Sequence, residues 1–132
     1  MERAVILLLL ALAINASTAD SDNYRTVKSA RQFIIGPVGW NGIVSDEEKA
    51  FNALCKAPDA ADQFRRILRE GTIAGKMYAL LGLRQVSAPD YKQQASRFRN
   101  STATVETVSG CAVEQDRVST VVVEWIDKMP LK

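Results

Sequence analysis

The hydrophobic positions of this chain begin with one short, continuous run. It spans residues 4–14, follows the basic residue Arg3, and precedes small and polar residues. Eleven apolar residues fall short of the roughly 20 that cross a membrane, and the order of basic, apolar and small residues is typical of a cleavable export signal. We therefore expect a signal peptide at residues 1–19, cut between Ala19 and Asp20.

A cut after Ala16 is the alternative, because small residues also precede that position. The mature chain is then expected in the periplasm or the medium, without a stable membrane anchor. Residues 20–32 are polar and aperiodic, which predicts a flexible leader. Residues 33–132 are long enough for one domain with one core.

Four amphipathic segments predict helices, and each begins at a residue that favours a helix start. Ser45 with Glu48 forms a capping-box pattern, and Asp59 and Thr72 are preferred N-cap residues. The expected helices occupy residues 45–57, 59–71, 73–86 and 87–100. Gly75 and Gly82 weaken the third helix by about 1 kcal/mol each relative to alanine, so we attribute them to close packing.

Two regions lack this clear helical pattern. Residues 36–42 contain three glycines, a proline and an Asn-Gly pair, which predict turns that lay Trp40 over the core. Alternating threonines and valines predict a short extended segment near 103–113. From about Asp116, apolar residues recur at spacings of three and four, which predicts a last helix, although the run of valines leaves a strand as the rival reading.

These elements together predict an all-α fold. We expect four to five short helices packed as antiparallel hairpins, with HEAT-like stacking as one arrangement. The second and third helices would form a hairpin around Gly71. The extended segment near 103–113 would be a minor addition.

Two cysteines, Cys55 and Cys111, follow the predicted signal. In an oxidising compartment they are expected to pair, and the bond would stabilise the fold by roughly 4 kcal/mol. The alternative is that both are small buried hydrophobic residues, since Cys55 shares a helix face with Phe51 and Leu54.

The chain contains no histidine, which removes the commonest general base and zinc ligand. Two carboxylate groupings lie at predicted helix starts, where capping accounts for them; they are Asp46 with Glu47 and Glu48, and Asp59 with Asp62. A serine nucleophile at Ser109 would need a lysine that no motif supplies. The glycine-rich segment lacks the lysine of a phosphate-binding loop. We therefore expect no catalytic residue, metal or cofactor.

Charge adds one exclusion. The 17 basic and 15 acidic residues leave a formal net charge of +2, whereas nucleic-acid-binding proteins usually carry a basic stripe. The basic residues near 65–69 and 92–99 are interleaved with acidic residues, which predicts a solvated mixed-charge surface.

Four segments also carry a family resemblance, at residues 33–39, 45–50, 74–84 and 108–111. In this order they resemble a family of small exported bacterial proteins that is named after an accessory gene of a microcin (antibacterial peptide) gene cluster. The resemblance implies a bacterial, exported, helical domain. It transfers no residue role, because the family has no established activity.

Three functions follow as hypotheses. The first is binding to a partner protein, as an accessory or immunity-like factor of the cell envelope, without catalysis. The second is a histidine-free enzyme that uses carboxylates or Ser109. The third is a carrier of a small apolar ligand, although the residues that would line its site are equally explained as core; they are Phe64, Met77, Leu81 and Trp125.

Overall fold

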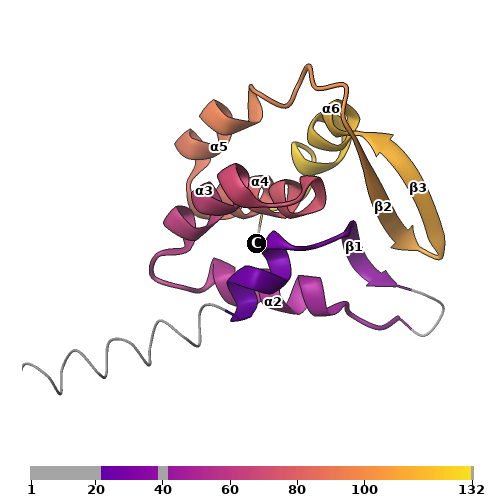
Figure 1. Cartoon of the computed structure of the whole chain (residues 1–132), viewed down its shortest axis with the longest axis horizontal. Coiled ribbons are helices and arrows are strands. Elements are labelled where there is room, and N and C mark those ends of the chain that lie inside the picture. Colours follow the sequence, from indigo (N-terminus) through magenta and orange to yellow (C-terminus); the bar gives the residue numbers. More distant parts are fainter. Residues whose placement is uncertain (1–21, 39–41, 132) are drawn as a thin grey trace, which may run out of the picture.

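A three-stranded sheet lies beside a group of helices (Figure 1). The computed structural model describes residues 22–38 and 42–131, so the predicted signal peptide, its cleavage position and Trp40 lie outside the described residues. The strands are β1 (Gln32–Val38), β2 (Thr104–Gly110) and β3 (Ala112–Arg117). The fold is therefore mixed α/β, and the prediction of an all-α fold with HEAT-like hairpins is wrong.

The order of strands in the sheet is β1-β2-β3. β1 pairs parallel with β2, and β2 pairs antiparallel with β3. The parallel pair joins segments far apart in the sequence, since Gln32 lies opposite Glu106. Such long-range pairing leaves no local pattern, which is why the strand character of residues 32–38 escaped the sequence analysis.

The four predicted helices are present, and their observed bounds are α2 (Asp46–Cys55), α3 (Ala60–Glu70), α4 (Ile73–Val86) and α5 (Ala88–Ala95). Two predicted caps are confirmed, because the side-chain oxygen of Ser45 accepts from the Glu48 N–H and that of Thr72 accepts from the Gly75 N–H. Asp59 instead accepts from the Gln63 side chain, at 2.7 Å.

Helix α4 lies at the centre of the core and contacts α2, α3, α5, β1 and β2. The aromatic rings of Phe33 and Phe51 pack against the ring of Tyr78 on this helix, and the ring of Phe64 packs against that of Phe51. The close packing expected at its glycines is confirmed. A Cβ at Gly82 would lie 2.4 Å from the Phe64 ring, and one at Gly75 would lie 2.7 Å from the Val27 carbonyl oxygen.

The described part of the predicted flexible leader, residues 22–32, is ordered rather than flexible. Residues 22–28 are helical, and Tyr24, Val27 and Ala30 are buried in the core. The start of α4 holds this segment, because the Thr72 N–H donates to the Lys28 carbonyl oxygen at 2.9 Å. One short helix buries too few apolar residues for its periodicity to be recognised in the sequence.

β1 continues into the segment where turns were expected. It passes through Gly36, whose φ is +75°, and its register with β2 shifts between Ile35 and Val38. A glycine with positive φ at such an irregularity allows a strand to bend without ending. The glycine therefore marks a bulge within β1.

The chain ends in a helical segment, which confirms the reading by periodicity over that of a strand. It comprises α6 (Val118–Thr120) and the π-helical turn η1 (Val121–Ile126). In η1 the backbone hydrogen bonds span five residues instead of four. An example is the Asp127 N–H, which donates to the Val122 carbonyl oxygen at 2.9 Å. The predicted start at Asp116 was too early, since that residue belongs to β3.

Candidate functional site

The hairpin of β2 and β3 projects to the side of the molecule away from α3 and α5 (Figure 1). Ser109 pairs with Ala112 in the register, so Gly110 and Cys111 form a two-residue turn. Gly110 has a φ of +59°, as the primed turns of tight hairpins require. The predicted extended segment near 103–113 is therefore confirmed, but it is the first half of a hairpin.

β3 is exposed along its length. Every residue of this strand except the half-buried Asp116 is exposed to solvent. Only β2 pairs with it among the described strands. In a two-residue hairpin the closing pair exchanges hydrogen bonds, and alternate residues then turn their N–H and C=O groups outward. From the register, the outward groups belong to Val113, Gln115 and Arg117.

The two faces of β3 differ in chemistry. Alternation along the strand places Glu114 and Asp116 on one face and Val113, Gln115 and Arg117 on the other. Asp116 accepts a 2.6 Å hydrogen bond from the buried Thr107 hydroxyl of β2, which fixes its side chain. The edge of the sheet therefore offers carboxylates on one face, and an apolar, an amide and a cationic side chain on the other.

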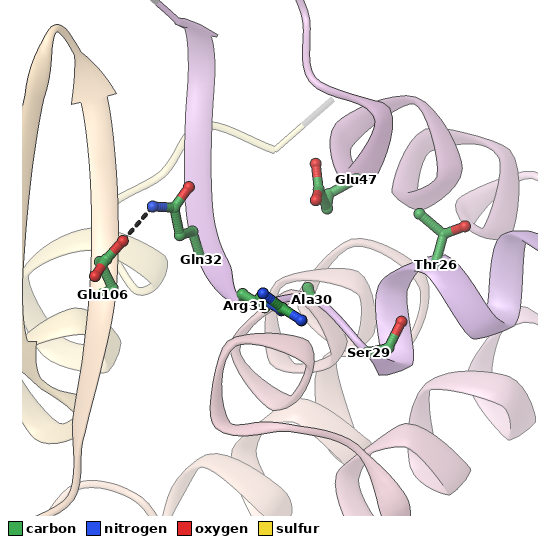
Figure 2. A pocket seen from close by; sticks show the side chains of 7 residues that line it. All are labelled: Thr26, Ser29, Ala30, Arg31, Gln32, Glu47 and Glu106. Carbon is green, nitrogen blue, oxygen red and sulfur yellow. Dashed lines mark hydrogen bonds between the residues drawn. The ribbon is translucent and has the colours of Figure 1, made fainter.

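A row of polar side chains crosses the sheet on the face to which Val113, Gln115 and Arg117 belong. Glu106 of β2 accepts hydrogen bonds from Gln32 of β1 and, at 3.2 Å, from Gln115 of β3. Figure 2 shows the Gln32 end of this row. The row links β3 to a pocket that Gln32 and Glu106 help to line.

That pocket has a volume of about 700 Å³ and opens widely to solvent. Figure 2 shows its lining, which comes from the N-terminal helix and the segment after it, from β1 and β2, and from the first turn of α2. Its charged residues are Arg31, Glu47 and Glu106. One guanidinium beside two carboxylates matches no single class of ligand, and Glu106 is already engaged by two amides.

The opposite edge of the sheet is closed by a side chain. The Ile34 N–H of β1 donates to the Tyr78 hydroxyl oxygen at 3.0 Å, and the same hydroxyl donates to the Ile34 carbonyl oxygen at 3.1 Å. Both groups are buried. Burial raises the pKa of the Tyr78 hydroxyl to about 12. One hydroxyl thus satisfies the two backbone groups that another strand would need.

The predicted disulfide between Cys55 and Cys111 is absent. Cys55 is half-buried on α2, Cys111 is exposed in the hairpin turn, and no disulfide joins them. The pairing was predicted from the oxidising compartment that an export signal implies, whereas the hairpin places Cys111 in an exposed turn at the end of the sheet. The alternative of two buried cysteines fits Cys55 better than Cys111.

The other residues considered for chemistry lie apart from one another. Asp46, Glu47 and Glu48 form the first turn of α2, and Asp62 pairs with Arg65. Ser109 is exposed at the end of β2, and its hydroxyl makes no hydrogen bond to a described lysine. In the described part of the chain, no three cysteine or carboxylate side chains are grouped as a metal site would need.

The residues proposed for an apolar carrier belong to the core. Phe64, Met77 and Leu81 are buried there, and Trp125 packs against it while half-buried.

None of the helices within residues 22–38 and 42–131 has the length and apolar character of a membrane-spanning segment.

Sequence reasoning missed β3. Its run Glu-Gln-Asp-Arg at 114–117 shows no apolar alternation, because neither face of the strand is covered. The available signal was Gly110 after an alternating segment, which is typical of a two-residue hairpin. Comparison with known proteins adds nothing to this site, since no protein-family model, curated protein or solved structure matches the chain. The resemblance to the microcin-cluster family therefore stays a prediction.

Proposed function

We propose that this chain acts by binding a partner protein, which adds a strand to the free edge of β3. The observation that carries the proposal is that β3 is exposed on both faces and unpaired along its outer edge among the described strands. Proteins usually protect such edges with charged side chains, proline, a bulge or a covering element. β3 contains no proline and its pairing with β2 is regular, so its protection rests on the charges of Glu114, Asp116 and Arg117, which a partner strand with the opposite charge pattern would neutralise.

The faces of β3 define the chemistry of the partner strand. Opposite residues in an antiparallel pair lie on the same face, where unlike charges attract. A partner strand should therefore carry an acid opposite Arg117, basic residues opposite Asp116 and Glu114, and an apolar residue opposite Val113. Read from its own N-terminus, the partner has the order acidic, basic, polar, basic, apolar.

A different protein fits this edge better than a second copy of the chain. Two copies of β3 paired about a two-fold axis at Gln115 would place Glu114 opposite Asp116 of the second copy. Centring the pair on Glu114 or on Asp116 places that carboxylate opposite itself. Like charges directly opposite destabilise strand pairing. The three central registers of self-pairing are therefore all unfavourable.

A synthetic peptide tests the proposal directly. The probe is a nonapeptide with the central sequence Glu-Lys-Thr-Lys-Val, titrated into the isotope-labelled chain and followed by amide hydrogen exchange. We expect slower exchange at the amides of Val113, Gln115 and Arg117, because strand addition engages those N–H groups. The matched control is the peptide Lys-Glu-Thr-Glu-Val, which meets like charges and should bind at least about tenfold more weakly.

Two variants at one position provide the control on the protein side. Gln115→Pro removes an outward N–H, so peptide binding should be lost. Gln115→Ala retains that N–H and should bind the peptide as the wild type does. Equal binding of both peptides, or of both variants, would contradict strand addition at β3.

The proposal retains export to the periplasm or the medium and requires no catalytic step. Amino-terminal sequencing of the protein from its host tests the export prediction. Asp20 as the first residue is the expected result, with Ser17 as the result of the alternative cut. A mature protein that still begins at Met1 would contradict it.

A further inference from the structure

A second pocket lies between α3 and the end of α5, on the side of the molecule away from β3 (Figure 1). Its volume is about 250 Å³, smaller than that of the pocket beside β1. Three of its lining residues are arginines, and no carboxylate lines it; the lining consists of Arg65, Leu68, Arg69, Gln94, Arg97 and Phe98.

Two helical elements bring these residues together. Arg65, Leu68 and Arg69 stand at spacings of three and four on α3, which places them on one face. Beyond α5 the chain continues in tight turns, in which the Phe98 N–H donates to the Ala95 carbonyl oxygen at 2.9 Å. These turns carry Arg97 and Phe98 to the same pocket.

The three arginines are not equivalent. Arg65 is paired with Asp62 on its own helix and with Asp90 of α5, so its charge is compensated. Arg69 and Arg97 form no ion pair with any residue in the described ranges, and both are exposed. Two uncompensated guanidinium groups that line one pocket repel each other, and an anion between them would remove this repulsion.

The rest of the lining is apolar or neutral. Leu68 is only 9% exposed and Phe98 is half-buried against the core. The pocket therefore combines an apolar wall with two guanidinium groups that have no ion-pair partner among the described residues, and the Gln94 amide adds a further hydrogen-bond donor. Guanidinium groups bind phosphate through paired hydrogen bonds that are stronger than neutral ones.

The geometry points to a binding site for a small phosphate monoester that carries an aromatic or compact apolar group. The phosphate lies between Arg69 and Arg97, and the apolar group lies against Leu68 and Phe98. Arg65 positions the wall of the pocket by linking α3 to α5 through Asp90. This inference does not depend on strand addition at β3, because the two sites share no residue.

Phenyl phosphate is the probe, titrated into the full mature chain by calorimetry at physiological ionic strength. We expect saturable one-to-one binding with a Kd below about 1 mM, because two charge-assisted contacts add to burial of the ring. Inorganic phosphate should bind about fivefold or more weakly, since it leaves the apolar wall empty. Phenol, which lacks the charge, should not bind measurably.

Substitutions distinguish binding at this pocket from nonspecific attraction of the phosphate to the positive charge of the helix. Arg69→Gln and Arg97→Gln should each weaken phenyl phosphate binding about tenfold or more. Arg66→Gln is the matched control, because Arg66 lies on the same helix but packs over the Tyr24 ring, 4.4 Å from its centroid. This control should bind as the wild type does. If Arg97→Gln fails to fold by circular dichroism, Arg69→Gln against Arg66→Gln decides the question.

A further arm distinguishes a free ligand from a lipid headgroup. Vesicles of phosphatidylglycerol and of phosphatidylcholine are compared by co-sedimentation, and we expect the chain to remain unbound to both. Three results would overturn the inference: no saturation by phenyl phosphate, equal losses in Arg66→Gln and Arg69→Gln, or binding to anionic vesicles without binding to phenyl phosphate.

Discussion

The two edges of the sheet carry the same kind of backbone groups, but these groups find hydrogen-bond partners within the protein at one edge and face solvent at the other. At β1, the Tyr78 hydroxyl bonds both the N–H and the carbonyl oxygen of Ile34. At β3, Val113, Gln115 and Arg117 turn their backbone groups to solvent, and their side chains are exposed too. β1 lies beside α4 within the core, whereas β3 extends beyond the helices (Figure 1).

The difference shows what burial requires of a strand edge. A buried edge must satisfy every backbone group inside the protein, so a side chain of suitable length and chemistry has to be supplied. A solvated edge is satisfied by water and can exchange that water for another strand. Only the second kind is available for binding, and the following changes test this contrast.

Removing the Tyr78 hydroxyl should have the largest effect. Tyr78→Phe leaves two buried backbone groups of Ile34 without a partner and should lower the free energy of unfolding by about 2–4 kcal/mol. Urea denaturation measures the change. Tyr91→Phe is the matched control, because the Tyr91 hydroxyl bonds Asp127 at a partly exposed site and its loss should cost less. Equal losses would contradict a special role for the closed edge.

Alkaline pH should act on the same contact. The folded pKa of Tyr78 is raised to about 12, above the ordinary value of about 10. Its contribution is therefore complete below about pH 10 and is lost as the pH rises toward 12. The stability gap between wild type and Tyr78→Phe should narrow over this range, by up to about 2 kcal/mol. Burial also raises the pKa of Tyr24 and Tyr91, but both proteins retain those groups. A constant gap would contradict the assignment.

The hairpin turn should show a smaller effect. Gly110 has a φ of +59°, so Gly110→Ala should cost about 1 kcal/mol. Gly110→Asn should cost a similar amount, because the negative φ of Cys111 makes the turn type II′, whose first position lies outside the left-handed helical region that asparagine tolerates. Exchange of the β3 amides should accelerate in the alanine variant while that of the α4 amides changes less. Uniform acceleration would indicate that the hairpin and the core open together.

The smallest change of stability is expected at the open edge itself. Gln115→Pro removes an N–H that points to solvent and should cost less than about 1 kcal/mol. Glu114→Pro removes an N–H that faces β2 and should cost about 1–3 kcal/mol. Thermal unfolding of the two variants checks this order. A larger stability loss in Gln115→Pro than in Glu114→Pro would mean that the N–H of Gln115 faces β2 and that of Glu114 faces solvent. The proposed binding edge would then be wrong by one residue.

Sequence reasoning succeeded where the signal is local. Ser45 and Thr72 cap their helices as expected, and Gly82 packs against Phe64 as its place in a helix implied. It failed where a segment needs a distant partner. β1 becomes a strand by pairing with β2 and by meeting Tyr78, and neither partner is close to it in the sequence.

The candidate site was the least predictable part. A strand exposed on both faces needs no hydrophobic alternation, so residues 112–117 carry no pattern that distinguishes them from a loop. The arginine pocket was read as a solvated mixed-charge surface. That prediction agrees with the ion pairs of Arg65 and with the exposure of Arg69 and Arg97, but it did not indicate that the latter two form no ion pair among the described residues. Which charges find partners depends on how α3 and α5 meet.

By itself, the sequence determined the predicted helices, the caps at Ser45 and Thr72 and the helical nature of the C-terminal segment, because neighbouring residues carry those signals. The tertiary structure alone decided that the fold includes a sheet, that Cys55 and Cys111 are not joined, and that one edge of the sheet is closed while the other is open. The physical reason is distance along the chain. A cap is satisfied within one turn of helix, whereas a strand edge is satisfied only by whatever element the fold places beside it.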